Sequence, residues 1–338
     1  NSISGELILP GDKSISHRAV MFSAMADGKS TVKNYLNSED VNSTIECFRK
    51  LGCTIEQTKS ELTIYGKGFG GFSKPDSALD AGNSGTTTRL ISGILSAQGF
   101  ESTIVGDASL SKRPMKRVVD PLSQMGAKIE TSDLGSLPMT IFATDELKAI
   151  EYDMQIASAQ IKSAVLLAGL HLDKETIVVE HSKTRNHTET LLGLKVEEFE
   201  GYRKIYSSKK NYPKPGEYIV PSDISTAAFF MVLALCSEKS ELLLKDVLLN
   251  ETRIGVISIL KQMGGKIEIE NSRTSSGEKL GDLRIFSSKL HNIEIDENII
   301  PNIIDEIPIL SVAGLFASGK FTIRNAEELR FKESDRIK

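Results

Sequence analysis

Apolar and polar positions along the chain follow one order that recurs several times. Each repeat opens with a mostly apolar segment that predicts a buried helix, as in R-A-V-M-F-S-A-M-A (18–26) and G-T-T-T-R-L-I-S-G-I-L-S-A (85–97). A turn and a short strand follow, and then an amphipathic helix such as S-T-I-E-C-F-R-K-L (43–51) ends at a glycine. A strand with alternating apolar residues comes next, as in K-I-E-I-E (266–270). The pattern predicts an α/β protein built from repeated units.

A six-residue motif marks the end of the second helix in three of these units. The copies are L-G-C-T-I-E (51–56), M-G-A-K-I-E (125–130) and M-G-G-K-I-E (263–268). The third copy follows the second at about twice the spacing that separates the first two, which leaves room for one more unit between them. Repetition at this spacing indicates that the units share one supersecondary structure.

Three further segments predict the opening helices of a third, fourth and fifth unit: S-A-Q-I-K-S-A-V-L-L-A-G-L (158–170), S-D-I-S-T-A-A-F-F-M-V-L-A-L (222–235) and I-D-E-I-P-I-L-S-V-A-G-L-F-A (304–317). The fifth unit reaches Lys338 where its second helix should begin, so we expect further C-terminal sequence, because a half-unit cannot bury its apolar faces alone. A stretch rich in Lys, Tyr, Pro and Gly (207–217) predicts a hinge or linker after the third unit.

Length, charge and cysteine content narrow the class of protein. A chain of 338 residues predicts about two domains, and 41 basic against 45 acidic residues give a net charge of −4. This balance argues against nucleic acid or a membrane surface as a partner, so any anion site must be local. The chain has no 18-residue apolar span and no signal-peptide pattern at its start. Three cysteines without metal-ligand spacing favour a reducing compartment, so we expect a cytoplasmic protein without a metal. We also expect a monomer, although no pattern in the sequence reports the oligomeric state.

The segment P-G-D-K-S-I-S-H-R (10–18) resembles a nucleotide-binding P-loop at first sight. A P-loop needs four residues between its glycines and an unbroken Gly-Lys-Ser/Thr. Here five residues separate Gly5 from Gly11, and Asp12 stands between Gly11 and Lys13. The sequence therefore does not support a nucleotide site.

What remains of this segment is a glycine turn followed by a helix. Ser14 or Ser16 is expected to cap the helix, and Lys13 and Arg18 then lie near the positive end of its dipole. Such a position favours an anion. The alternative is a capped surface helix with two solvated cations.

Polar residues recur at the start of the first helix in every unit. Pseudo-symmetric helix N-termini would direct their N–H groups toward a common cleft, which favours one or two strongly anionic ligands. Ordinary capping explains the hydroxyl groups of each cluster taken alone, but not the recurring Lys and Arg beside them. The clusters are Lys13, Ser14 and Arg18; Asn83, Ser84, Gly85, Thr86 and Arg89; Ser158, Ala159, Gln160 and Lys162; Ser222, Asp223 and Ser225; and Asp305 and Glu306.

Two loop segments add further cations. S-K-R-P-M-K-R (111–117) carries four of them around a proline, and a solvated basic face is the alternative. L-R-F-K-E-S-D-R (329–336) alternates cations and anions, and an i,i+3 ion pair on a helix would explain Glu333 and Arg336 equally well.

Taken together, these motifs resemble those of the 5-enolpyruvylshikimate-3-phosphate (EPSP) synthase family of enolpyruvyl transferases, in the same order and from end to end of the chain. The motifs are P-G-D-K-S-I-S-H-R-A, D-A-G-N-S-G-T-T-T-R-L, K-R-P-M, S-A-Q-I-K-S-A, I-D-E-I-P and K-E-S-D-R. The resemblance implies a two-domain fold of βαβαββ-type units, an inside-out α/β barrel with five of six units present. One domain would span 12–219, and the other, discontinuous and incomplete at its C-terminus, would comprise 1–11 and 220–338. It also implies an active site in the cleft between the domains.

The resemblance further implies the reaction. The carboxyvinyl group of phosphoenolpyruvate would move to the 5-hydroxyl of shikimate 3-phosphate with release of phosphate, a step of aromatic amino-acid biosynthesis. No metal, nucleotide or redox cofactor is called for, and glyphosate is the expected inhibitor. Further phosphoenolpyruvate ligands of the family, a His-Arg pair and a final Lys, would lie beyond Lys338, so we expect a polypeptide that ended there to be inactive.

The family pattern assigns roles to individual residues. Lys13, Asp305 and Glu333 would be catalytic. Shikimate 3-phosphate would contact Lys13, Ser14, Arg18, Ser158, Ala159, Gln160, Ser182, Asp305 and Lys332. Phosphoenolpyruvate would contact Lys13, Asn83, Gly85, Arg113, Gln160 and Arg336. Two positions depart from the pattern: Ala159 replaces a serine of many members, and Glu328 stands where some have Asn.

Two alternatives remain. The related UDP-N-acetylglucosamine enolpyruvyl transferases have Lys-Asn where this chain has Lys13-Ser14, and often a reactive Cys where it has K-R-P-M. A non-catalytic anion-binding fragment of the same fold is the second alternative. Retention of Lys13, Asp305 and Glu333 together counts against it, since a binding protein needs no acid and base.

Overall fold

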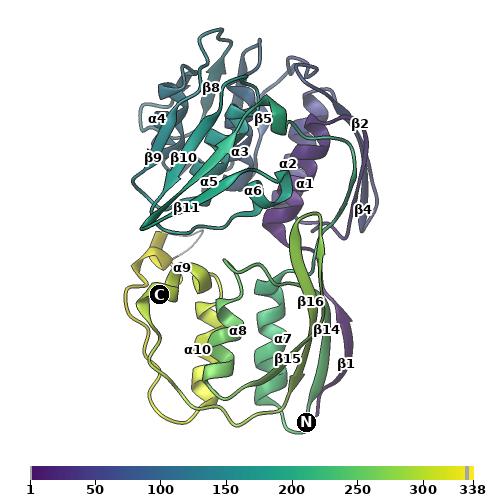
Figure 1. Ribbon diagram of the computed structural model, residues 1–338, viewed down its shortest axis with the longest axis vertical. Helices are drawn as coiled ribbons and strands as arrows, with labels where there is room; N and C mark the ends of the chain where they lie inside the picture. The colour runs from purple at the N-terminus through teal and green to yellow at the C-terminus, as the bar shows by residue number, and fades with distance from the viewer. Residues whose placement is uncertain (1, 332–334) are drawn as a thin grey trace. The chain divides into compact units, whose positions relative to one another are not determined.

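The computed structural model describes residues 2–331 and 335–338, which divide into two compact units. Unit 1 comprises Asn1–Asp12 and Pro221–Lys338, and unit 2 comprises Lys13–Val220 (Figure 1). The chain therefore enters unit 2 once and leaves it once, and each unit is described by itself.

Within the described residues, unit 2 has three four-stranded sheets with one strand plan. In each sheet the first two strands are parallel, and the later strands pair antiparallel as a hairpin. This plan confirms the predicted βαβαββ-type unit. The sheets, in spatial order, are β13 (Glu217–Ile219), β2 (Asp27–Lys33), β4 (Glu61–Lys67) and β3 (Thr54–Gln57); β5 (Leu79–Asp80), β6 (Ser102–Val105), β8 (Met139–Phe142) and β7 (Lys128–Thr131); and β9 (Glu151–Met154), β10 (Thr176–Glu180), β12 (Tyr202–Ser207) and β11 (Val196–Phe199).

Three apolar helices form the core of unit 2: α1 (Lys13–Met25), α3 (Gly85–Leu95) and α5 (Ala159–Gly169). Most of their residues are buried, because sheets and helices of the same unit cover them on several sides. A Cβ on Gly93 of α3 would lie 2.1 Å from the carbonyl oxygen of Ala164 in α5. Glycine at this position therefore permits the close approach of α3 and α5.

The repeated six-residue motif is a helix C-terminus followed by a strand. Gly52, Gly126 and Gly264 have φ of +97°, +98° and +93°, a conformation that favours glycine. Each follows the C-cap residue of a helix: α2 (Glu39–Lys50), α4 (Lys116–Gln124) and α8 (Gly255–Gln262). Helix α6 (His187–Leu192) ends in the same way at Gly193, with φ of 58°. The third unit thus has its own copy of the motif, L-G-L-K-V-E (192–197), which the sequence analysis did not recognise.

Unit 1 has one four-stranded sheet among its described residues, in the order β1 (Ser4–Ile8), β14 (Glu241–Leu248), β16 (Glu278–Phe286) and β15 (Lys266–Ser275). Helices α7 (Ile224–Cys236) and α8 pack on this sheet, and α10 (Ile307–Phe316) packs on α7, as Figure 1 shows. The first strand of this sheet, β1, comes from the N-terminus, whereas β13 supplies the matching strand beside β2 in unit 2. This exchange of first strands makes unit 1 discontinuous in sequence.

Two local predictions are wrong. The stretch 207–217 is no linker: it forms η2 (Lys209–Asn211) with a capping box at Ser208, and the Tyr212 ring packs edge-on against Phe69 with centroids 5.1 Å apart. Neither Ser14 nor Ser16 caps α1, because the helix already begins at Lys13, and the Ser16 hydroxyl instead accepts a hydrogen bond from the Leu36 backbone at 2.9 Å.

The C-terminal described part contains η3 (Glu297–Ile299), α9 (Ile300–Ile303), α10 and η4 (Glu327–Phe331). Among the described residues, no single helix is long and apolar enough to cross a membrane; Glu297–Ile303 and Ile307–Phe316 reach the required length only as a pair bent by 114°.

Candidate active site

The first turn of α1 carries the predicted Lys13, Ser14 and Arg18. The Lys13 ammonium lies 3.0 Å from the Asp40 carboxylate on α2, and both side chains are partly exposed. A lysine ammonium group has three N–H donors and can contact more than one acceptor at a time. The pair therefore places a cation at the N-terminus of α1 without burying it.

Arg18 is buried on one side of this helix. Its Nη1 donates to the Ser14 carbonyl at 3.0 Å, its Nε to the Thr188 hydroxyl at 2.7 Å and its Nη2 to the Ser163 hydroxyl at 2.8 Å. Ser163 lies on α5 and Thr188 on α6, so neutral groups of two other helices fix the guanidinium. These hydrogen bonds hold the Arg18 guanidinium in one position next to the first turn of α1.

A second group lies at the start of α3. Asn83 bridges two charged side chains: its amide donates to the Asp107 carboxylate at 2.6 Å, and its carbonyl oxygen accepts from Arg113 Nη2 at 2.8 Å. The Asn83 hydrogen bond holds the pKa of Asp107 below its ordinary value. The structure thus brings Asn83 and Arg113 together, as the sequence predicts for one ligand.

Gly85 and Gln160 complete the group through an arginine that the sequence analysis left without a role. Arg89 Nη1 donates to the Gln160 side-chain oxygen at 3.0 Å, and the Gln160 amide donates to the Thr86 hydroxyl at 3.0 Å. A Cβ on Gly85 would lie 2.6 Å from Arg89 Nη1 and 3.5 Å from Arg113 Nη1. Gly85 therefore leaves room for two guanidinium groups beside the start of α3.

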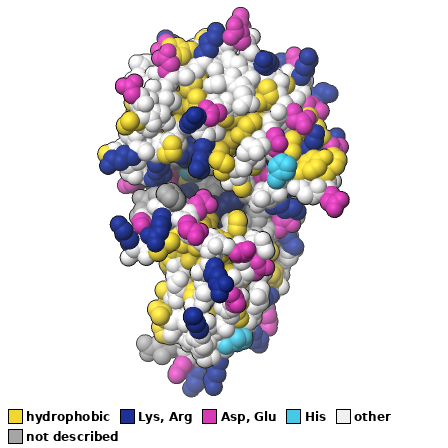
Figure 2. Space-filling view, turned by 90° about the vertical axis from the view of Figure 1, so that its left-hand side faces the viewer, with side chains coloured by type: hydrophobic (Ala, Val, Ile, Leu, Met, Phe, Trp, Pro, Cys, Tyr) yellow, Lys and Arg dark blue, Asp and Glu magenta, His cyan; other side chains and the backbone are white. Residues whose placement is uncertain are grey.

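The charges around the start of α3 favour the binding of an anion. Burial, together with the nearby charges of Arg113 and Arg117, lowers the pKa of Arg89 to about 10. Within residues 2–331 and 335–338, no carboxylate lies within 4.0 Å of the Arg89 or Arg113 guanidinium. On the face drawn in Figure 2, by contrast, cationic and anionic side chains are interspersed. Two arginines gathered around amide groups are suited to a phosphate or carboxylate.

The remaining unit 2 candidates lie at or near α5. Ser158 is the N-cap of α5 and accepts from the Ile161 backbone at 3.4 Å, and Ala159 is the first residue of the helix. Ser182 is exposed in the loop between β10 and α6. Ser158 and Gln160 thus lie on one helix turn, whereas Ser182 belongs to a separate loop.

Unit 1 supplies Asp305 and Arg336, which lie side by side. Arg336 Nη1 is 3.0 Å from Asp305 Oδ1, and both side chains are about one-quarter exposed. Asp305 lies just before α10, and the adjacent Glu306 is the N-cap of that helix. Lys332 and Glu333 lie outside the described residues.

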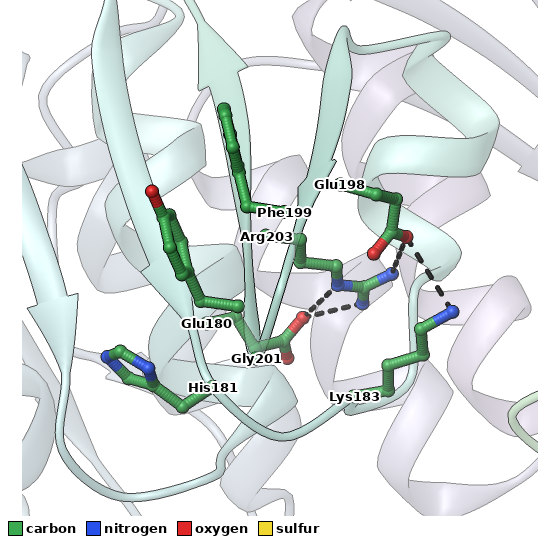
Figure 3. A pocket seen from close by; sticks show the side chains of 8 residues that line it. Glu180, His181, Lys183, Glu198, Phe199, Gly201 and Arg203 are labelled. Carbon is green, nitrogen blue, oxygen red and sulfur yellow. Dashed lines mark hydrogen bonds and ion pairs between the residues drawn. The ribbon is translucent and has the colours of Figure 1, made fainter.

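A shallow hollow of about 220 Å³ on the sheet of β10, β12 and β11 involves none of the predicted site residues (Figure 3). Its charged groups are paired with each other, since Glu198 lies 3.6 Å from Lys183 and 3.9 Å from Arg203, and Arg203 also contacts Glu180. Its charges are therefore compensated from within.

Among the described residues, no group of three or more His, Cys, Asp or Glu side chains is arranged so that it could hold a metal ion. Burial raises the pKa of the Cys47 and Cys53 thiols to about 12, so neither is a ready nucleophile.

Asp40 is an addition that the tertiary structure makes to the predicted set, whereas Arg89 was named in the polar cluster at the start of α3 but was assigned to neither substrate. Arg89 was visible in G-T-T-T-R-L, four residues after Gly85 and hence on the same face of a helix. That spacing was the available signal. Asp40 carried none, because its contact with Lys13 spans 27 residues.

Comparison with solved structures defines the class of fold. The chain aligns with an enolpyruvyl transferase, NikO, from Streptomyces tendae at a TM-score of 0.69, covering 94% of this chain and 74% of that one. At 14% identity this likeness shows the fold alone, that of the enolpyruvyl transferases. An EPSP synthase from Acinetobacter baumannii aligns at a TM-score of 0.91 with 46% identity, covering 99% of this chain and 76% of that one.

Sequence relatives define the family. The model described as EPSP synthase (3-phosphoshikimate 1-carboxyvinyltransferase) matches residues 1–338. A 3-phosphoshikimate 1-carboxyvinyltransferase of Oceanobacillus iheyensis is 49% identical over 338 residues, 99% of this chain and 79% of that protein. One of Syntrophomonas wolfei is 47% identical over 341 residues, 99% of this chain and 78% of that protein. The chain belongs to the EPSP synthase family.

Proposed function

We propose that the two units divide the work of the family's reaction between them, unit 2 holding anionic groups and unit 1 transferring a proton. The reaction is the activity of this protein: the carboxyvinyl group of phosphoenolpyruvate moves to the 5-hydroxyl of shikimate 3-phosphate, phosphate leaves, and 5-enolpyruvylshikimate 3-phosphate forms for aromatic amino-acid biosynthesis. In this proposal the two compact units are the two domains of the enzyme.

The main physical difficulty of the reaction is charge. The two substrates together carry roughly six negative charges, so repulsion opposes their approach unless fixed cations offset it. The single observation that carries the proposal is the pair of arginines at the start of α3, Arg89 and Arg113, whose nearest partners are the amides of Gln160 and Asn83. Preorganised cations of this kind act without reorganising during the reaction.

Phosphoenolpyruvate is assigned to this group. Arg113 would hold its phosphate or carboxylate through two N–H donors, and Gly85 would let the ligand approach the start of the helix. Lys13 would supply a mobile point charge. The complete proposed set is Lys13, Asn83, Gly85, Arg113, Gln160 and Arg336, to which we add Arg89.

Shikimate 3-phosphate is assigned to hydroxyl and cationic groups on α1 and α5. Ser158 and Gln160 would meet the 3-phosphate at the N-terminus of α5, where the helix dipole favours negative charge. Ala159 offers only its backbone there. The complete proposed set is Lys13, Ser14, Arg18, Ser158, Ala159, Gln160, Ser182, Asp305 and Lys332.

Two carboxylates would move the protons. Asp305 would accept the proton of the 5-hydroxyl, and Glu333 would protonate the methylene carbon and then take a proton back as phosphate leaves. Addition needs one proton given and one removed, so separate acid and base groups fit the chemistry. Arg336 lies 3.0 Å from Asp305, so a cation that is itself a proposed phosphoenolpyruvate ligand stands directly beside the proposed base.

We further propose that glyphosate competes for the phosphoenolpyruvate residues, and that the protein acts as a monomer in the cytoplasm. Analytical ultracentrifugation tests the oligomeric state, and inhibition kinetics with phosphoenolpyruvate as the varied substrate test the competition.

Phosphate release from phosphoenolpyruvate, followed with and without shikimate 3-phosphate, tests the function itself. Release that requires shikimate 3-phosphate and yields the enolpyruvyl ether by NMR is the expected result. UDP-N-acetylglucosamine serves as the competing acceptor in a parallel reaction. Transfer to that acceptor, or none to shikimate 3-phosphate, would refute the proposal.

A further inference from the structure

Unit 1 contains a buried ion network outside the residues assigned so far. The Arg253 side chain is 3% exposed and lies between β14 and α8. Its Nη1 is 3.1 Å from the Asp12 carboxylate, its Nη2 donates to the Ser225 hydroxyl at 2.8 Å, and the same nitrogen lies 3.8 Å from the Glu306 carboxylate. The Ser225 hydroxyl donates in turn to Glu306.

Both carboxylates are sequence neighbours of proposed functional residues. Glu306 directly follows Asp305, and Asp12 directly precedes Lys13. Glu306 also begins α10, because its carbonyl accepts from the Leu310 backbone at 2.9 Å. A displacement of the Glu306 side chain would therefore be passed to the backbone that carries Asp305.

The loop that carries Arg253 is itself well fixed. The Asn250 side-chain oxygen accepts from the Thr252 backbone at 2.9 Å and from the Thr252 hydroxyl at 2.7 Å. The Asn250 amide donates to Glu278 at 2.8 Å, and the Arg253 backbone donates to the Asn250 carbonyl at 2.9 Å. The guanidinium thus comes from an anchored loop and can act as a fixed brace.

The charges around Arg253 keep it ionised. Burial alone would disfavour the cation, but the carboxylates of Asp12, Glu306, Asp223 and Asp305 outweigh burial and raise the pKa of Arg253 above its ordinary value. Removing this cation would leave Asp12 and Glu306 buried without their compensating charge, which is a large penalty. A lysine would keep the charge but lacks the planar fork that reaches two partners at once.

We infer that Arg253 is a positioning residue for the proposed base: through Glu306 it fixes the backbone that carries Asp305, and through Asp12 it ties the segment before Lys13 to the same point. The inference rests on the proposed function, since Asp305 has a task only in that reaction. Arg253 itself is buried and is assigned no contact with substrate.

A double-mutant cycle in the native full-length protein tests this inference. Arg253→Lys should lower kcat by about 10- to 100-fold, because small misplacements of a reacting group have effects of that size. In an Asp305→Asn background the same substitution should change kcat by less than about twofold, because a residue that acts through Asp305 has nothing left to position. A purely structural role would give the same loss in both backgrounds.

Arg284 provides the matched control. It also lies in unit 1 and pairs with two carboxylates, Glu270 at 2.7 Å and Glu241 at 2.8 Å, on the sheet. Arg284→Lys should leave kcat unchanged in both backgrounds. Ser225→Ala covers the case in which Arg253→Lys does not fold: it removes the hydroxyl between Arg253 and Glu306, and kcat should fall by about three- to tenfold, again only when Asp305 is present.

The outcomes separate the inference from the proposed function. An active wild-type protein in which Asp305→Asn strongly lowers kcat, but Arg253→Lys and Ser225→Ala act equally in both backgrounds or not at all, overturns the inference and leaves the function standing. A wild-type protein that does not form the enolpyruvyl ether overturns both.

Discussion

Arginines in the two units have opposite surroundings. In unit 2, Arg89 and Arg113 meet side-chain amides, and no carboxylate among the described residues lies within ion-pair distance of them. In unit 1, the more deeply buried Arg253 meets two carboxylates and a hydroxyl. The pKa values shift in opposite directions accordingly: that of Arg89 falls to about 10, and that of Arg253 rises.

This difference shows how the partners of an arginine indicate its task. A guanidinium held by neutral groups keeps its charge available and is destabilised by neighbouring cations, so an incoming anion relieves the strain. A guanidinium neutralised by buried carboxylates has no charge to offer and acts as a brace. We therefore expect substitution of Arg113 to affect substrate binding and substitution of Arg253 to affect turnover.

The largest effect is expected from the proposed base. Asp305→Asn should lower kcat by about 1,000-fold with little change in the KM for phosphoenolpyruvate, because loss of general base catalysis has effects of that order. Steady-state kinetics of phosphate release measure both constants. Glu238→Gln, an exposed carboxylate of the same unit, should have no effect. A variant of Asp305 that retains full kcat would contradict the assignment of proton transfer to unit 1.

Removal of a unit 2 cation should act mainly on binding. Arg113→Ala should raise the KM for phosphoenolpyruvate by about 10- to 100-fold, since a hydrogen bond to a charged group contributes about 1.5–3 kcal/mol. Lys112→Ala, at the exposed neighbouring position, controls for general loss of positive charge and should change KM far less. Equal effects of the two substitutions would show that long-range charge, and no specific contact, attracts the substrate.

Gly85→Ala tests the space beside the two arginines. The new Cβ would lie 2.6 Å from Arg89 Nη1, so the guanidinium must move. Glyphosate, which has one more atom than phosphoenolpyruvate between its phosphorus and its carboxylate, should be more sensitive to the lost space. We expect its inhibition constant to rise about tenfold more than the KM for phosphoenolpyruvate, a difference of about 1.4 kcal/mol. Titrations with glyphosate and with phosphoenolpyruvate, run in parallel, measure the two constants. An equal rise of the inhibition constant and of KM would contradict this prediction.

The smallest expected effect is on the free energy of unfolding, and it arises from a histidine of unit 2. Burial lowers the pKa of His171 in unit 2 to about 4, while an unfolded histidine titrates near 6.5. Between these values the unfolded chain binds more protons, so stability should fall as the pH drops through this range, by about 2 kcal/mol between pH 7 and pH 5. Urea denaturation of the wild type and of His171→Gln, each at pH 7 and pH 5, measures this loss. If the free energy of unfolding of the variant depends on pH as that of the wild type does, His171 is not the source of the pH dependence.

Much of the fold could be predicted because its signals are local. The end of a helix at Gly52, Gly126 or Gly264 needs only a residue that accepts positive φ, and the apolar helices need only a run of buried side chains. The wrong prediction of a linker at 207–217 has the same cause, because it too was based on local composition alone. Its Pro and Gly content is typical of a linker, but packing of Tyr212 on Phe69 and pairing of β13 with β2 hold it in unit 2.

The candidate site could be predicted only in part. Asn83, Gly85 and Arg113 came from motifs, and the structure brings them together. The proposed role of Arg89 depends on its contact with Gln160, which lies 71 residues away in the sequence. A contact over that separation cannot be predicted from a local sequence pattern.

By itself, the sequence determined the repeated unit, the helix ends and the family, because helix caps, apolar periodicity and motif residues are properties of short segments. Only the tertiary structure decided which partner each charged group meets. Lys13 with Asp40, and Arg253 with Asp12, are pairs separated by 27 and 241 residues. Whether a buried arginine is available to a ligand or neutralised as a brace depends on those distant partners, since charge interactions follow distance in space and not order along the chain.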